Sequence, residues 1–354
     1  MSHSPPPFSP LPACPVPLPA NDVITLAHGG GGLLGQRLLE SVFLPGFGQN
    51  PGAQARHDGA IFTGAAGQWA FTSDAHVVAP LFFPGGDIGR LAVFGTANDL
   101  LMCGARPLFL SLCFILEEGF PIADLRRVAE SIGAAAREAG AEVVTGDTKV
   151  VEKNRGDGLY LAASGIGRIV KPCLPAKICP GDAILLSGDI GRHGVAVMAH
   201  REGLAFETEI KSDCACLAPP VLALLESGID VHCLRDLTRG GLAAALIELA
   251  AASGYAMAFD ETRIPVEEQV RGACELLGLD PLFVANEGRF VTFVPAVQTS
   301  AALEILHAFD LSQKAVCIGS VGDQSGTPHV AVSGLSGVPR ILQLPAGEQL
   351  PRIC

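Results

Sequence analysis

Hydrophobic positions along the chain follow both helical and strand spacing, which predicts a protein that mixes the two kinds of element. In the first half, apolar residues recur at helical spacing over Ile88–Met102 and Ile122–Ala139. The first of these helices is expected to stop at the following Gly104 and Pro107, since both residues interrupt helices. Shorter apolar runs predict strands at 60–62, 68–72, 108–116, 142–145 and 160–169, and a helix is expected after the glycines at 29–32.

The second half repeats the mixture without a regular period. A turn at Pro180–Gly188 leads into a strand, and helices are predicted from Gly194 and over 220–226 and 241–252. Further strands are expected near Val284 and Val291. A length of 354 residues suits about two domains. We therefore expect an α+β protein with an N-terminal domain over 21–172 and a C-terminal domain over 173–345.

The two ends differ from the rest of the chain. Residues 1–20 are rich in proline, which predicts a flexible extension. Residues 346–354 predict a mobile tail that ends in Cys354. Nine extended residues span about 30 Å, so the terminal thiol could reach a cleft. A frayed end without function is the simpler alternative, and we interpret the thiol as a carrier of a chemical group.

Composition narrows the classes of partner. The formal charge of −12 argues against nucleic acid and anionic membranes, which select basic surfaces. The N-terminus lacks the features of a signal peptide, and no stretch is long and apolar enough to predict a membrane span. The eleven cysteines are odd in number and lack zinc or disulfide spacing, so we expect mostly reduced core thiols and a cytoplasmic location.

Candidate chemistry comes from acidic residues in predicted loops and strand ends. Common nucleotide and hydrolase motifs are absent, whereas five aspartates stand out. Asp58, Asp74, Asp147 and Asp236 have this setting, and Asp99 lies in the helix predicted over 88–102. Carboxylates are the ligands that Mg²⁺ prefers, usually together with phosphate oxygens. Lys149 lies near Thr145 in the same predicted loop and suits a phosphate. Taken singly, each such residue is more often a turn or surface residue than a ligand. The pattern alone therefore indicates no more than a candidate Mg²⁺–phosphate site.

An ordered set of motifs carries a sharper resemblance. The segments HGGGG, TSDAHVV, PGGDIG, GTANDLL, FILEEG, VTGDTKVV, SDCA, LRDLTRGG, ANEG and a terminal PRIC occur in this order between about residue 22 and the end. Together they resemble the HypE family of hydrogenase maturation carbamoyl dehydratases. The resemblance implies the two-domain PurM-like architecture of aminoimidazole ribonucleotide synthetase, with N-terminal domains pairing through their sheets in a homodimer and ATP held near that interface.

The family's reaction gives the terminal thiol a purpose. The resemblance implies that a HypF-like carbamoyltransferase loads a carbamoyl group onto Cys354, and that ATP-dependent dehydration then leaves S-cyanocysteine. It implies Glu287 of ANEG as the general base and Lys149 as a catalytic cation. Glu287 as an ordinary turn carboxylate is the alternative. The cyano group would pass to a HypC–HypD complex for the iron centre of a [NiFe]-hydrogenase.

Ligand contacts are likewise implied by resemblance. Mg²⁺ would be bound by Asp58, Asp99, Asp147 and Asp236. Nucleotide contacts would come from His28, Gly29, Gly30, Asp74, Asn98, Asp99, Thr145 and Asp147. The loop at 28–32 would cover the phosphates with backbone N–H groups, although His28 could equally be a polar residue that precedes a helix.

Two other classes stay open at this point. One is a small-molecule kinase of the thiamine-monophosphate kinase or selenophosphate synthetase type, against which the terminal PRIC and the cysteine-free HGGGG segment argue. The other is a non-enzymatic scaffold or metal-storage module, which no CxxC pair supports.

Overall fold

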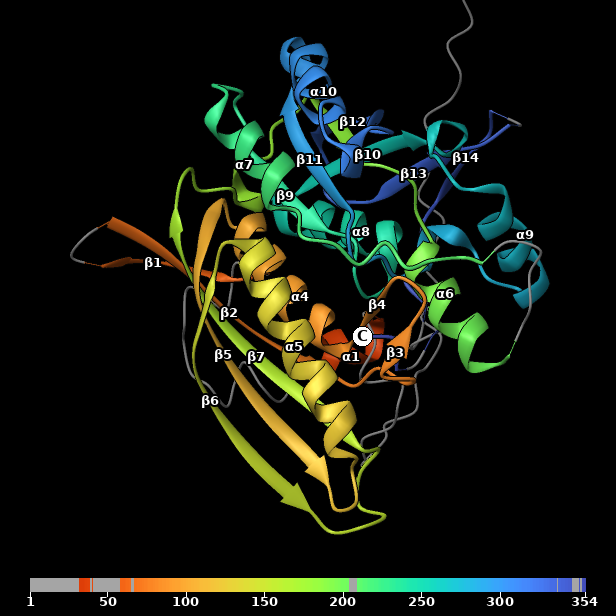
Figure 1. Ribbon diagram of the computed structural model, residues 1–354. Coiled ribbons are helices and arrows are strands. Elements are labelled where there is room, and N and C mark those ends of the chain that lie inside the picture. Colours follow the sequence, from red (N-terminus) through yellow and green to blue (C-terminus); the bar gives the residue numbers. More distant parts are fainter. Residues whose placement is uncertain are drawn as a thin grey trace, which may run out of the picture.

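Two β-sheets, each formed by one part of the chain, organise the computed structural model (Figure 1). The structure describes residues 32–38, 40, 58–64, 67–203, 209–335, 337–345, 350 and 352–354. The predicted proline-rich extension and the loop residues His28, Gly29 and Gly30 lie outside these residues. The stretch after the glycines contains helix α1 (Leu33–Leu38).

The first sheet has five strands in the order β1-β2-β7-β5-β6. Only the β5–β6 pair is parallel; the other pairs are antiparallel. The strands are β1 (Ala60–Gly64), β2 (Gly67–His76), β5 (Ala105–Glu117), β6 (Glu142–Val151) and β7 (Leu159–Ile169). A parallel pair needs a crossover, which helix α5 (Ile122–Ala139) supplies. A two-stranded ribbon, β3 (Phe82–Phe83) and β4 (Gly86–Asp87), follows β2.

Helices α4 (Ile88–Met102) and α5 cover one face of this sheet (Figure 1). The Asp87 carboxylate begins α4 as an N-cap, accepting hydrogen bonds from the amides of Gly89 and Arg90 at 2.8 and 3.1 Å. Nearly all of α4 is buried, whereas α5 buries one stripe and ends at Gly140, whose φ of 67° suits glycine. The core of the first unit therefore lies between α4, α5 and the sheet.

The opposite face of the first sheet is apolar and exposed within the described chain. Phe71 on β2, Ile166 on β7 and Phe109 on β5 lie directly opposite one another across neighbouring strands. All three are at least 36% exposed, and the exposed side chains of Phe62 and Ile115 lie on the same face. Removing such an apolar face from water is favourable, so this surface is suited to contact another protein surface.

The second sheet has seven strands in the order β14-β13-β10-β12-β8-β11-β9, antiparallel except for β10–β13. Its strands are β8 (Asp182–Leu186), β9 (Cys233–Asp236), β10 (Tyr255–Asp260), β11 (Phe290–Pro295), β12 (Val316–Gln324), β13 (Val330–Ser333) and β14 (Pro339–Ile341). The accompanying helices are α6 (Arg192–Arg201), α7 (Ala218–Glu226), α8 (Gly241–Ser253), α9 (Glu268–Leu277) and α10 (Thr299–His307). One continuous core includes α4 and α7, so the two units are packed together.

Most predicted elements are confirmed, with two clear errors. The loop predicted to contain Thr145 and Lys149 is wrong, because these residues pair with β5 and continue strand β6 to Val151. The helices expected at 88–102 and 122–139 have these bounds. The strand expected near Val284 is wrong: Pro281–Phe283 forms a short 3₁₀ helix that Asp280 begins by accepting from the Leu282 amide. A proline at its first position and a side-chain cap favour a helical turn over a strand.

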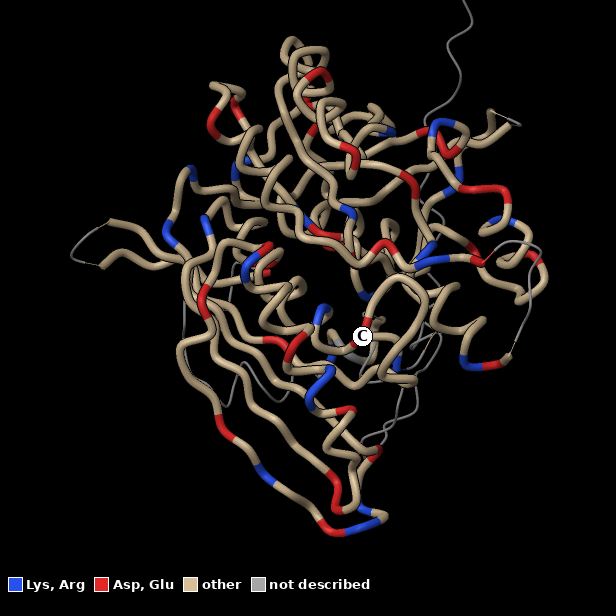
Figure 2. The backbone as a smooth tube through the Cα atoms, viewed as in Figure 1, with Lys and Arg blue, Asp and Glu red and all other residues tan. Residues whose placement is uncertain are grey.

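Charges and thiols agree with the composition. Acidic and basic residues are scattered over both units instead of gathering in one patch (Figure 2). None of the ten cysteines in the described part forms a disulfide, and six of them are buried, as expected for core thiols. Among the described helices, none combines the length and apolarity that crossing a membrane requires.

Candidate functional site

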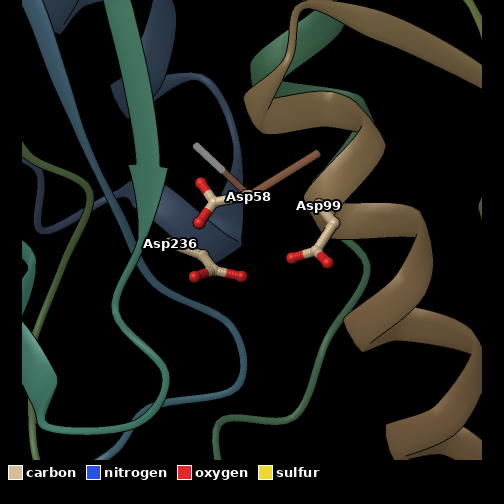
Figure 3. Close-up of side chains that lie close together, drawn as sticks. All are labelled: Asp58, Asp99 and Asp236. Atoms are coloured by element: carbon tan, nitrogen blue, oxygen red, sulfur yellow. The ribbon is translucent and has the colours of Figure 1, made fainter. Parts of the chain in front are cut away.

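Three aspartates from distant parts of the sequence converge where the two units meet. Asp58 precedes β1, Asp99 lies on α4, and Asp236 ends β9 (Figure 3). One carboxylate oxygen from each lies within 4.8 Å of those of the other two. In Figure 3 the three side chains point toward a common centre. The sequence predicted these residues as metal ligands, and the fold brings them together.

Neighbouring side chains hold the three carboxylates in place. The Thr72 hydroxyl of β2 donates to Asp99 at 2.7 Å, and the Thr238 hydroxyl donates to Asp236 at 3.2 Å. Arg235 forms an ion pair with Asp58, with 2.8 Å between Nε and Oδ1. Ordered side chains of this kind preorganise a ligand site.

The electrostatics of the cluster favour a bound cation. Burial raises the pKa of Asp58 to about 6, although Arg235 opposes the shift. Burial and the charge of Asp58 raise the pKa of Asp236 to about 7. The pKa of Asp99 is raised well above its usual range by burial and then by Asp236, Asp74 and Asp58. A divalent cation among these oxygens would relieve the repulsion, and hard oxygen ligands suit Mg²⁺. The residues therefore fit a magnesium site.

Asp74 and Glu287 extend the acidic cluster. Asp74 lies on β2 with its Oδ2 atom 3.5 Å from Nε2 of buried His76. Glu287 is 5% exposed, and its Oε1 atom is buried without a hydrogen-bond partner among the described residues. Burial raises the pKa of Glu287 well above its usual range, and Asp236, Asp74 and Asp213 add to the shift. A buried carboxylate oxygen without a partner is uncommon in folded proteins, which makes Glu287 a candidate site residue.

The backbone around Glu287 is fixed by Asp213. The Asp213 carboxylate accepts hydrogen bonds from the amides of Glu287 and Gly288 at 3.2 and 3.1 Å. Only glycine fits at position 288, because a Cβ atom there would lie 2.0 Å from the Asp213 carbonyl oxygen. Asn286 beside them is fully buried and accepts from the Gly191 amide at 2.7 Å. The ANEG motif is therefore a rigid loop that presents the Glu287 carboxyl group.

The C-terminus reaches this site. The terminal carboxylate of Cys354 accepts a hydrogen bond from the Val77 amide at 3.0 Å, just beyond the end of β2. Figure 1 shows the C-terminus between the two units, beside α1, β3 and β4. Burial lowers the pKa of Arg239, but Cys354 and the site aspartates outweigh it and leave the pKa raised. Arg239 therefore interacts electrostatically with both Cys354 and the acidic cluster.

Three predicted residues lie elsewhere in the same chain. Thr145, Asp147 and Lys149 are on β6, opposite Ser111, Cys113 and Ile115 of β5 in the register. Lys149 and Asp147 are largely exposed and form an ion pair of 3.3 Å. They occupy the uncovered face of the sheet with Ile115, and β6 is three strands from β2, or about 14 Å. Asp147 is thus not among the clustered carboxylates of its own chain.

Asn98 has its amide group occupied by the protein. Its Nδ2 atom donates to the Ala215 carbonyl at 3.0 Å, and its Oδ1 atom accepts from the Leu217 amide at 2.9 Å. These bonds attach α4 to the segment before α7. A nucleotide contact by Asn98, predicted from the sequence, stays a prediction.

Sequence reasoning missed several residues of the site: Thr72, Asp213, Arg235 and Arg239. Arg235 and Arg239 flank Asp236 in LRDLTRGG, and Asp213 is in SDCA, so the motifs contained them. Arginines beside a predicted acidic site were a usable signal, because buried carboxylates require positive partners. Thr72 had no distinguishing signal.

Two matches to known domain families define the fold class of the protein. Residues 56–169 match the model of the AIR synthase related protein N-terminal domain, and residues 179–330 match that of the C-terminal domain. A thiamine monophosphate kinase structure from Aquifex aeolicus shares this fold at 16% identity, with a TM-score of 0.58 and 79% and 92% of the two chains covered. The two-domain PurM-like fold expected from the sequence is confirmed.

Closer relatives define the family. The chain is 48% identical to carbamoyl dehydratase HypE of Cupriavidus necator over 94% of this chain and 95% of that protein. It resembles the HypE of a HypE–HypF complex at 43% identity and a TM-score of 0.82, covering 87% and 99% of the two chains. A HypE structure with ATP matches at 43% identity and a TM-score of 0.78, covering 94% and 100%. The chain belongs to the HypE family of carbamoyl dehydratases.

Proposed function

We propose that this protein uses ATP to dehydrate a carbamoyl group carried on the Cys354 thiol, forming S-cyanocysteine. One observation carries the proposal: the terminal residue is held by the Val77 amide beside an acidic site that contains the buried carboxyl group of Glu287. The residue that would carry the carbamoyl group is thus held at the site by the protein itself. Family membership supports the same reaction.

Dehydration requires a better leaving group than oxide. We propose that the carbamoyl oxygen attacks the γ-phosphorus of ATP, the bond to ADP breaks, and one N–H proton is lost to give an imidoyl phosphate on sulfur. Removal of the second N–H proton then breaks the C–O bond, leaving S–C≡N and inorganic phosphate. The sum is the loss of one water from the thiocarbamate and the hydrolysis of one ATP.

Glu287 is suited to remove the N–H proton. Its Oε1 atom is buried and available, and the Asp213 contacts fix the loop that bears it. A carboxylate with a raised pKa is a stronger base than an exposed one once it is ionised. A cation bound by Asp58, Asp99 and Asp236 would offset the acidic field that raises the pKa of Glu287. Mg²⁺ would also bind phosphate oxygens of ATP and balance their charge.

Lys149 and Asp147 can serve the reaction only from a second copy of the chain. They lie on the uncovered face of the first sheet, away from the acidic site of their own chain. The apolar ladder of Phe71, Ile166 and Phe109 on that face favours pairing of two sheets. We propose a homodimer in which β6 of one protomer completes the nucleotide site of its partner.

The tail must also leave the site. We propose that Cys354 is loaded by a HypF-like carbamoyltransferase and passes its cyano group to a HypC–HypD complex, all in the cytoplasm. Because one thiol must meet three centres, residues 346–354 are proposed to alternate between the docked position and an outward position. The solved HypE–HypF complex supports the first partner.

The test is the intact mass of the protein after incubation with carbamoyl phosphate, Mg-ATP and the carbamoyltransferase. Wild type is expected to gain a carbamoyl group and then lose the mass of one water. Cys354→Ala is expected to gain nothing, and Glu287→Gln to keep the carbamoyl group. ATP turnover on a small acceptor without any adduct would instead favour a small-molecule kinase of the same fold.

A further inference from the structure

The docked tail is held by its backbone on two sides. On one side, the Val77 amide donates to the terminal carboxylate of Cys354 at 3.0 Å, and the Ala79 amide donates to the Arg352 carbonyl at 3.1 Å. On the other side lies α6, where the Arg201 guanidinium also donates to the Arg352 carbonyl. The side chains of Leu350 and Ile353 are buried. The protein therefore binds the tail at several residues and not only at Cys354.

His193, the second residue of α6, holds the peptide group that joins Ile353 to Cys354. Its Nε2 atom lies 2.7 Å from the Ile353 carbonyl oxygen. A carbonyl oxygen can only accept, so Nε2 carries the proton. The imidazole is fully buried, and burial lowers its pKa although Asp213 and the Ile353 carbonyl oppose the shift. The ring is therefore neutral near pH 7, with Nδ1 as an acceptor.

Ser212 fixes this tautomer. Its hydroxyl lies 2.8 Å from Nδ1 of His193, and its oxygen accepts from the Cys214 amide at 3.0 Å. The hydroxyl proton is thus directed to Nδ1, which keeps the ring proton on Nε2 facing the tail. The Phe83 ring packs edge-on against the imidazole, with 5.5 Å between centroids. The ring is held rigidly in the orientation that binds the tail.

The next residue of α6 is shaped for the tail as well. A Cβ atom at Gly194 would lie 2.9 Å from Cδ1 of Leu350 and 2.6 Å from Cγ1 of Val284. The close approach of Leu350 to the backbone therefore requires glycine here. The start of α6 is fitted to the tail at two successive residues.

We propose that His193 is a positioning residue that anchors the tail through the Ile353 carbonyl and so presents the Cys354 thiol to the dehydration site. The proposal deepens the proposed function and rests on it. Because Ser212 and Asp213 are consecutive, one segment orients both the tail anchor and the loop of Glu287. The positions of the Cys354 thiol and the Glu287 carboxyl group are thereby fixed relative to each other by the same short segment.

The anchor is tested first without any carbamoyl chemistry, on the full-length protein. Iodoacetamide alkylation is followed at individual cysteines by peptide mass spectrometry, with exposed Cys179 as the internal reference. His193→Phe keeps an aromatic ring but removes the donor, and should speed labelling of Cys354 roughly threefold to tenfold relative to Cys179. His193→Gln restores a donor near Nε2 and should restore most of the protection. His307→Phe is the matched control, since His307 also binds a backbone carbonyl, that of Ala315, away from the site.

The second arm measures single-turnover dehydration of carbamoylated Cys354 in the same variants. His193→Phe should slow it, His193→Gln should recover it, and His307→Phe should match wild type. Ser212→Ala leaves the imidazole in place and should change both readouts in the same direction, which covers the case in which His193→Phe does not fold. Unchanged Cys354 labelling in His193→Phe, or faster labelling of that variant with normal dehydration, would overturn the proposal. Wild type that never dehydrates would overturn the proposed function, while the labelling still decides whether His193 anchors the tail.

Discussion

Asp213 holds Glu287 by its backbone and not by its side chain. The Asp213 carboxylate accepts from the amides of Glu287 and Gly288, which leaves the Glu287 carboxyl group directed elsewhere, with Oε1 unbonded among the described residues. Two acidic residues from segments 74 positions apart thus meet at one loop and have different tasks. Asp213 therefore positions the loop, while the Glu287 carboxyl group stays available for the reaction.

Asp213→Ala should slow dehydration about a hundredfold, since small displacements of a catalytic group have effects of this size. It should also destabilise the fold by about 2–3 kcal/mol, because two buried amides lose their acceptor. Single-turnover mass spectrometry and chemical unfolding measure the two effects. ATP binding, measured by calorimetry, should stay near the wild-type value; a rate within twofold of wild type would show that the Asp213 contacts do not position Glu287.

Gly288→Ala should be severely destabilising, at roughly 2 kcal/mol or more, since the new methyl group would overlap the Asp213 carbonyl. Gly272→Ala in α9 is the matched control, because a Cβ atom there meets nothing within 4 Å. That change should raise stability by about 0.5–1 kcal/mol, as removing a helical glycine does. Thermal unfolding distinguishes them, and equal behaviour of the two variants would contradict the described packing.

The acidic cluster predicts an unusual pH dependence of stability. Asp58 and Asp236 have pKa values raised to about 6 and about 7, above the usual value of 3.8. The folded state therefore binds more protons than the unfolded state between about pH 4 and 7, so metal-free stability should fall as pH rises through this window. Mg²⁺ should cancel much of the fall.

Asp99→Asn should remove part of this effect. It takes one charge from the cluster, so the metal-free variant should melt a few degrees above wild type at pH 7.5 but gain little from Mg²⁺. Asp323→Asn, which changes an exposed residue near the end of β12, is the control and should behave as wild type. Thermal melts with and without Mg²⁺ at several pH values provide the measurement. Equal Mg²⁺ stabilisation of Asp99→Asn and wild type would rule out a metal site at Asp99.

A mixing experiment tests whether Lys149 acts across a dimer. Neither Lys149→Ala nor Cys354→Ala should dehydrate efficiently alone, but a mixed dimer would combine an intact Cys354 from one protomer with an intact Lys149 from its partner. An equal mixture should then recover up to about a quarter of wild-type activity, given random pairing. Refolded or co-expressed mixtures are assayed by mass spectrometry. No recovery despite proven exchange of protomers would place Lys149 outside its partner's site.

The sequence predicted much of the fold because its strongest signals are local. The long helix of residues 88–102 carries its own cap at Asp87, and the 122–139 helix has a regular apolar stripe. The 3₁₀ turn at Pro281–Phe283 shows the opposite case, in which apolar residues lie in a turn that is buried by tertiary packing. An apolar run of that length does not distinguish a strand from a buried turn.

The site was predictable in residue type and less so in arrangement. The motifs predict Asp58, Asp99 and Asp236 as metal ligands, although these residues are far apart in sequence. Only the fold brings their carboxylate oxygens within 4.8 Å of one another. Lys149 is likewise predicted as a site residue, yet in its own chain it lies on the sheet face that α4 and α5 do not cover. No motif points to His193, because the contact that gives it a role joins residues 160 positions apart.

The fate of the carbamoyl oxygen tests the central claim most directly. Protein loaded with carbamoyl phosphate whose carbonyl oxygen is oxygen-18 is given Mg-ATP, and the inorganic phosphate released is analysed by mass spectrometry. Dehydration through a phosphorylated carbamoyl group on Cys354 predicts that the heavy oxygen appears in phosphate as the S-cyano form accumulates. Heavy oxygen found in water, with unlabelled phosphate, would contradict ATP-driven dehydration at this site.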